Sequence, residues 1–82
     1  MNNTIREIRV FTTDSEFVVD KIILNTEQFS ILKEAIDNSG DPRVVYVYQI
    51  ELQKCLDAKI NLPEKYLNDS FEFFLHSYKV QD

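Results

Sequence analysis

One segment of the chain carries signals for both the start and the end of a helix. It runs from Leu24 to Pro42 and reads LNTEQFSILKEAIDNSGDP. Asn25 is a good N-cap residue, and Gln28 three positions later fits a capping box in which asparagine replaces the usual serine or threonine. Leu24 and Phe29 have the spacing of a hydrophobic staple. These signals predict a helix that begins at about residue 26.

The apolar residues of this segment recur at helical spacing. Phe29, Leu32 and Ile36 form a stripe, which is typical of a helix that buries one face. Gly40 is the only glycine in the chain and stands where a left-handed C-cap residue is expected, with a proline shortly after it. We therefore predict an amphipathic helix over residues 26–38.

Most of the remaining chain has the alternation and composition of β-strands. Thr4–Thr12 and Phe17–Leu24 are separated by a short polar link, which predicts an antiparallel hairpin. Arg43–Gln49 is the strongest strand candidate, and Phe71–Val80 is the last one. Both carry bulky side chains on each face, as expected of strands that are covered on both sides.

The segment from 50 to 60 fits two interpretations. In the first, the alternation of the preceding strand continues into this segment. In the second, which we favour, a helix covers residues 51–59, because apolar residues recur at i, i+3, i+4 and i+8. These apolar residues are Leu52, Cys55, Leu56 and Ile60. Pro63 is expected to open a short helical turn through Leu67.

The pattern as a whole predicts an α+β fold with two layers. Its mostly antiparallel sheet has about four strands, packed with one well-capped helix and a shorter second helix. Residues 1–82 are expected to form a single compact domain. The chain is 44% hydrophobic and 12% aromatic, which is too apolar for a disordered protein. We expect no membrane segment and no signal peptide, because no apolar run approaches about 18 residues.

The charge balance argues against direct binding to nucleic acid. The net charge is −5 with a pI near 4.7, and phosphate backbones are bound by clustered lysine and arginine. The nine basic residues are scattered among acids along the sequence: Arg6, Arg9, Lys21, Lys33, Arg43, Lys54, Lys59, Lys65 and Lys79. A local basic patch remains compatible with this spacing.

No residue pattern predicts catalysis or a cofactor. His76 and Cys55 are the only histidine and the only cysteine, so a zinc ligand set is missing, and a chain with one glycine has no glycine-rich phosphate loop. We interpret His76 as a structural residue between strand neighbours. We interpret Cys55 as a buried, inert thiol, and a single cysteine favours a reducing compartment such as the cytoplasm.

The aromatic residues provide the main functional hypothesis. One helix covers only one face of a four-stranded sheet, yet both faces of the last two strands carry bulk. We predict that Tyr46, Tyr48 and Tyr78 lie on the less covered face and contact a partner, because exposed apolar patches and tyrosines are typical of interfaces. The alternative is that these residues are ordinary core.

These observations favour a non-catalytic protein-binding domain. A small acidic domain without a deep pocket fits an inhibitor, an immunity-type protein or an adaptor that occludes a basic or mixed surface. One alternative is a homo-oligomeric structural subunit that pairs through its aromatic face. A second is a weak acidic mimic of nucleic acid that binds a DNA-binding protein. An enzyme is not expected.

Overall fold

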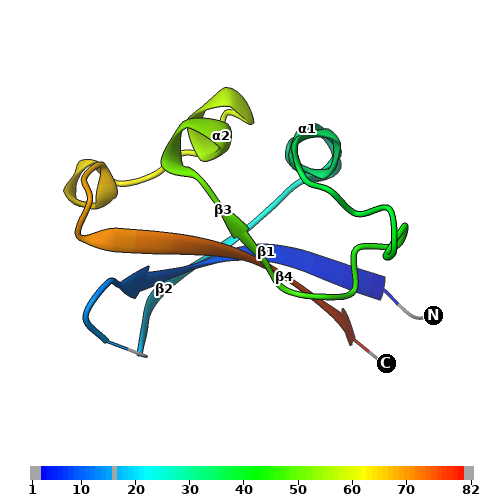
Figure 1. Ribbon diagram of the computed structural model, residues 1–82, viewed down its shortest axis with the longest axis horizontal. Coiled ribbons are helices and arrows are strands. Elements are labelled where there is room, and N and C mark those ends of the chain that lie inside the picture. Colours follow the sequence, from blue (N-terminus) through cyan, green and yellow to red (C-terminus); the bar gives the residue numbers. More distant parts are fainter. Residues whose placement is uncertain (1–2, 16, 81–82) are drawn as a thin grey trace.

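The computed structural model describes residues 3–15 and 17–80. It contains a four-stranded antiparallel sheet with strand order β2-β1-β4-β3, and it confirms the predicted α+β fold. Both α-helices lie over the same face of the sheet (Figure 1). The elements follow one another as β1 (Asn3–Thr12), β2 (Val18–Ile23), α1 (Thr26–Ala35), β3 (Tyr48–Ile50), α2 (Leu52–Asp57), a 3-10 turn η1 (Glu64–Tyr66) and β4 (Phe71–Val80).

The centre of the sheet is the pairing of β1 with β4. The two strands are in register over their full length, from Asn3 opposite Val80 to Thr12 opposite Phe71. The predicted hairpin is also present, since β2 pairs antiparallel with β1 on its other side. β3 pairs only with the first half of β4, through residues 73–75. The second half of β4 therefore has no β3 residue beside it.

The hydrophobic core fills the space between the sheet and the two helices. Ile8 and Val10 of β1 and Leu75 of β4 are fully buried there, as is Leu32 of α1. Cys55 of α2 is also fully buried, which confirms the expected position of this thiol. The other buried apolar residues of this cluster are Leu24, Val44, Ile50, Ala58, Ile60, Leu62, Tyr66 and Phe73.

The start of α1 is as predicted, but its end is not. The Asn25 side chain accepts the Gln28 amide, and the Gln28 side chain accepts the Asn25 amide, at 2.8 and 3.0 Å. The helix ends at Ala35 rather than at residue 38, because Ile36 is extended, with φ −110°, and packs against the core. Gly40 is not left-handed. The stop is therefore made by burial of the Ile36 side chain rather than by a glycine cap.

The second helical region confirms the helix interpretation of residues 51–59, since α2 occupies Leu52–Asp57. The short turn near Pro63 is also present as η1, with Pro63 before its first residue rather than in it. Lys59 has a positive φ of 61° after α2. This left-handed residue lets the chain turn back, so that both Ala58 and Ile60 are buried in the core.

The predicted strand Arg43–Gln49 is wrong over most of its length. Only Tyr48 and Gln49 belong to β3, and residues 43–47 form a loop instead. The extended conformation is interrupted at Val44, whose backbone has a left-handed φ of 55° and whose side chain is fully buried. That conformation is costly for a β-branched residue, so other contacts must hold the loop in place.

The carboxylate of Asp41 supplies most of those contacts. It accepts the backbone N–H groups of Val45 and Tyr46 and the hydroxyl of Tyr48, at 3.0, 2.9 and 2.9 Å. Burial alone would raise the pKa of Asp41, but these hydrogen bonds and the charge of Arg6 outweigh it, so the pKa is lowered. A loop with these amides satisfied by a side chain no longer needs a neighbouring strand.

We predict that α1 is held by its buried face more than by its cap. Leu32→Ala is expected to lower the free energy of unfolding by about 2–5 kcal/mol, because Leu32 is fully buried. Asn25→Ala is expected to cost about 1 kcal/mol through the lost cap. Urea denaturation followed by circular dichroism measures both, with exposed Glu34→Ala as the matched control. A Leu32→Ala midpoint equal to that of the control would contradict the assigned core.

Candidate functional site

The sheet surface that faces away from the helices is uncovered, and we call it the open face. Ile8 and Val10 point into the core, so alternation directs their neighbours in β1 to the opposite side. Strand register then brings residues of all four strands together on this surface. They are Ile5, Glu7, Arg9 and Phe11 of β1, Val18, Lys21 and Ile23 of β2, Gln49 of β3, and Glu72, Phe74, His76, Tyr78 and Val80 of β4.

Much of the open face is apolar and accessible. Ile23 is 60% exposed, and Val18 and Tyr78 are each 40% exposed. Phe11 and Phe74 contact each other edge to face, with ring centroids 5.4 Å apart. These two rings, with Val47 and His76 among others, line a shallow hollow of about 340 Å3. A hollow of this size accepts one large side chain of a partner.

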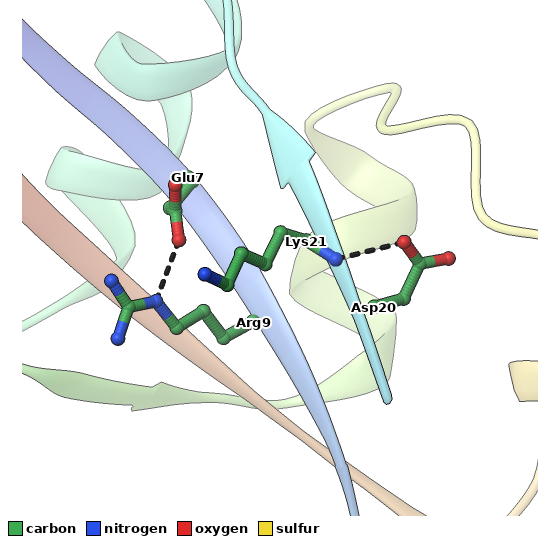
Figure 2. A network of polar contacts seen from close by, with 4 residues as sticks. All are labelled: Glu7, Arg9, Asp20 and Lys21. Atoms are coloured by element: carbon green, nitrogen blue, oxygen red, sulfur yellow. Dashed lines mark hydrogen bonds and ion pairs between the residues drawn. The ribbon is translucent and has the colours of Figure 1, made fainter. Parts of the chain in front are cut away.

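A buried ion pair lies in the middle of the open face. Glu7 is only 2% exposed, and its carboxylate accepts the Nε–H of Arg9 at 2.6 Å (Figure 2). Burial alone would raise the pKa of Glu7. Hydrogen bonds from Arg9 and Tyr78, together with the charges of Arg9 and Lys21, outweigh burial and lower the pKa. The carboxylate is therefore charged at neutral pH and already has partners within the fold.

The open face is electrically balanced, unlike the chain as a whole. It carries two acids, Glu7 and Glu72, and two bases, Arg9 and Lys21, whereas the net charge of the chain is −5. His76 adds no charge at neutral pH, because burial and the neighbouring cation Arg9 lower its pKa further. The excess negative charge therefore lies elsewhere on the chain, in part on the helices.

The outer edge of β2 is blocked against pairing with another strand. The backbone N–H of Lys21 donates to the Asp20 carboxylate at 2.8 Å (Figure 2). The other carboxylate oxygen accepts the hydroxyl of Tyr66 at 3.0 Å, which fixes the acid in place. A fixed charge on an edge strand opposes strand addition. Contact with a partner is therefore expected through the open face rather than through this edge.

The three tyrosines proposed as binding residues do not share one surface. Tyr78 lies on the open face, opposite Ile5. Tyr46 is 67% exposed but stands in the loop before β3. Tyr48 lies on the helix side with its hydroxyl on Asp41. The expected common face is wrong for Tyr46 and Tyr48, because Tyr46 lies in a loop and the register of β3 places Tyr48 opposite the core residue Leu75.

Other residues of the open face were not singled out from the sequence. Ile23 and Phe11 become part of this surface through their neighbours on other strands. Alternation along β1 does place Arg9 and Phe11 opposite the core residues Ile8 and Val10. It does not show which side the helices cover, because that depends on packing between distant segments.

The only cysteine and the only histidine of the chain lie in different parts of the fold. Cys55 is fully buried, and burial raises the pKa of its thiol to about 12. His76 stands opposite Glu7 on the open face. Within residues 3–15 and 17–80, no group of three His, Cys, Asp or Glu side chains is placed to hold a metal ion. No helix in this part of the chain is long and apolar enough to cross a membrane.

Comparisons of the chain with protein-family models, with curated proteins and with solved structures find no match. The candidate site therefore rests on the geometry and charge of the residues described above.

We predict that Cys55 reacts slowly while the protein is folded. A thiol with a pKa raised to about 12 is almost entirely protonated at pH 8, and only the thiolate attacks a labelling reagent. Labelling with a chromogenic disulfide reagent is expected to be slow in buffer and fast in denaturant. Equal rates in the two conditions would show that the thiol is accessible in the folded state.

We also predict that Glu7 contributes to stability in a pH-dependent manner. Its pKa is lowered in the folded state, so its contribution is present above the unfolded pKa of about 4.3 and is lost as the pH falls through the lower folded value. Denaturation at a series of pH values from 7 to acid measures this loss. Glu7→Gln is expected to be less stable at pH 7 and to lose less stability in acid. Exposed Glu34→Gln is the control, and identical pH profiles for all three proteins would contradict the prediction.

Proposed function

We propose that this chain is a non-catalytic protein-binding domain that covers an apolar surface of another protein with its open face. The observation that carries the proposal is an uncovered sheet face with exposed Ile23 and Tyr78 and a hollow beside Phe11 and Phe74. Exposed apolar patches of this kind are typical of association surfaces. The role fits an inhibitor, an immunity-type protein or an adaptor. A single buried thiol suits a reducing compartment such as the cytoplasm.

The size of the open face sets the kind of complex. A ten-residue strand is about 33 Å long, and four strands span about 15 Å between the outer axes, which gives at most roughly 500 Å2 per partner, because β2 and β3 are shorter than β1 and β4. Burying about 1,000 Å2 in total lies at the lower end for specific complexes. Such an interface relies on a few well-buried contacts, and the hollow beside Phe11 and Phe74 offers a place for one of them.

Charge favours a different protein over a second copy. Two copies would bring together two net charges of −5, and a large net charge opposes self-association. A partner that has an apolar centre and is basic overall would match both the balanced open face and the net negative charge of the chain. A homo-oligomer and a nucleic-acid mimic remain alternatives. Both agree less closely with the charge distribution than a different protein partner does.

The experiment compares substitutions on and off the open face. Ile23→Lys and Val18→Lys each place a charge at an exposed apolar position of the face, and Leu56→Lys does the same on α2, where Leu56 is 40% exposed. Proteins captured from the native host by the wild type are identified by mass spectrometry, and the affinity of the leading partner is measured with purified proteins. Each face variant is expected to bind about thirtyfold more weakly, equivalent to roughly 2 kcal/mol. Leu56→Lys is expected to bind like the wild type.

Two other results would contradict the proposal. A partner that is lost with Leu56→Lys but kept by both face variants would place the contact elsewhere. If sedimentation shows that the wild type is a dimer and that Ile23→Lys is a monomer, the partner of the open face is a second copy of the chain and not a different protein.

A further inference from the structure

The largest concentration of positive charge lies in a cavity on the helix side of the sheet. This cavity has a volume of about 470 Å3 and is lined by residues of α1, of the loop that follows it, and of β1 and β4. The first residues of β1 and the last residues of β4 lie side by side (Figure 1). Four of the nine basic residues line it: Arg6 from β1, Lys33 from α1, Arg43 from the loop and Lys79 from β4. These residues are far apart in sequence, and only the fold gathers them.

The cavity contains no acidic residue in its lining. This is unusual in a chain with fourteen acids and nine bases. Among the described residues, the only ion pair joins Arg9 to Glu7, and neither of these lines the cavity. The nearest carboxylate with a defined role is Asp41, whose charge acts on Arg6. Its oxygens already accept three hydrogen bonds, from Val45, Tyr46 and Tyr48, and Asp41 is not among the residues that line the cavity.

Arg6 is held rigidly at the base of the cavity. Its guanidinium lies over the Phe29 ring, 4.2 Å from the centroid. Nη1 donates to the carbonyl oxygens of Arg43 and Val44 and to the hydroxyl of Ser77, at 2.9, 2.6 and 2.7 Å. All the side-chain hydrogen bonds that join Arg6 to other described residues use this one nitrogen.

The other two guanidinium nitrogens of Arg6, Nε and Nη2, have no hydrogen-bond partner among residues 3–15 and 17–80. No buried side-chain nitrogen or oxygen in the described part of the chain lacks a hydrogen-bond partner, so Nε and Nη2 reach solvent. Together these two nitrogens form the edge of the guanidinium that binds a phosphate or carboxylate in a bidentate manner. A fixed guanidinium with a free edge has little entropy to lose when an anion binds.

We propose that this cavity binds a small organic phosphate. Arg6 holds the phosphate group at the base, Arg43, Lys33 and Lys79 neutralise its charge from three sides, and Ser77 contributes a hydroxyl. The organic part of the ligand packs against the apolar side of the cavity, which Phe29, Pro42 and Val45 provide. Tyr78 borders both this cavity and the open face, but phosphate binding does not depend on the protein-binding role proposed for that face.

Charge and shape select phosphate over other anions. A phosphate monoester carries a charge of about −1.5 to −2 near neutral pH, whereas a monocarboxylate carries only −1 for the same four cations. A long nucleic acid fits less well, because its further phosphates would extend beyond the cavity across the surface of a chain with net charge −5. The volume of about 470 Å3 lies in the range of small-ligand sites.

The test is a titration of the 82-residue chain, labelled with 15N, with phenyl phosphate, inorganic phosphate and benzoate. Phenyl phosphate is expected to bind at a single saturable site and to shift the amide signals of Arg43, Ser77 and Lys79. Benzoate is expected to bind at least tenfold more weakly, and inorganic phosphate in between. Raising the ionic strength from about 0.02 to about 0.15 M should weaken the binding of all three ligands, because the site is partly open to solvent.

Substitutions then locate the site. Arg43→Gln and Lys79→Gln each remove one exposed cation and leave the hydrogen bonds of Arg6 unchanged. Each is expected to lower the affinity for phenyl phosphate about tenfold. Lys54→Gln and Lys65→Gln are matched controls outside the cavity and should bind like the wild type. Unchanged affinity in both cavity variants, or shifts that never saturate, would overturn the proposal. If a short single-stranded oligonucleotide binds more tightly than phenyl phosphate, the ligand of the cavity is nucleic acid and not a small organic phosphate.

Discussion

The pairing of β1 with β4 holds together two segments from opposite ends of the described chain. Ten residues of each strand are in register, and each of the other strands attaches to one member of this pair. The pair buries Ile8, Val10 and Leu75 under the helices and turns Glu7, Arg9 and Phe74 the other way. One ladder of hydrogen bonds therefore defines both the core and the open face.

The two α-helices both lie on the same side of that ladder (Figure 1), and this asymmetry has a physical origin. A short chain has little apolar surface to divide between two cores. Leu32 of α1 and Cys55 of α2 are both fully buried in the single cluster. On the opposite face, the ion pair between Arg9 and the buried Glu7 carboxylate is surrounded by exposed aliphatic and aromatic side chains.

The loop between α1 and β3 depends on a second set of polar contacts. Asp41 binds the loop from within, and Arg6 binds its carbonyl oxygens from β1. These contacts outweigh the unfavourable backbone conformation of Val44, and they draw Arg43 toward the ends of β1 and β4. The arrangement that interrupts the expected strand also builds the basic cavity. The surface is thereby divided into a balanced apolar face, a cationic cavity and an acidic remainder.

The sequence alone determined those features that depend on neighbours along the chain. Asn25 and Gln28 cap α1 as their spacing predicts, the strand at Phe71–Val80 has the predicted bounds, and the apolar spacing around Cys55 identifies α2. Backbone capping and side-chain periodicity act within a few residues, so the sequence carries them directly. The tertiary structure decided the rest. It placed the helices on one face and removed Tyr48 from the open face. It also brought Arg6, Lys33, Arg43 and Lys79 to one cavity, because these outcomes depend on contacts between residues that are distant in sequence and on competition for a single core.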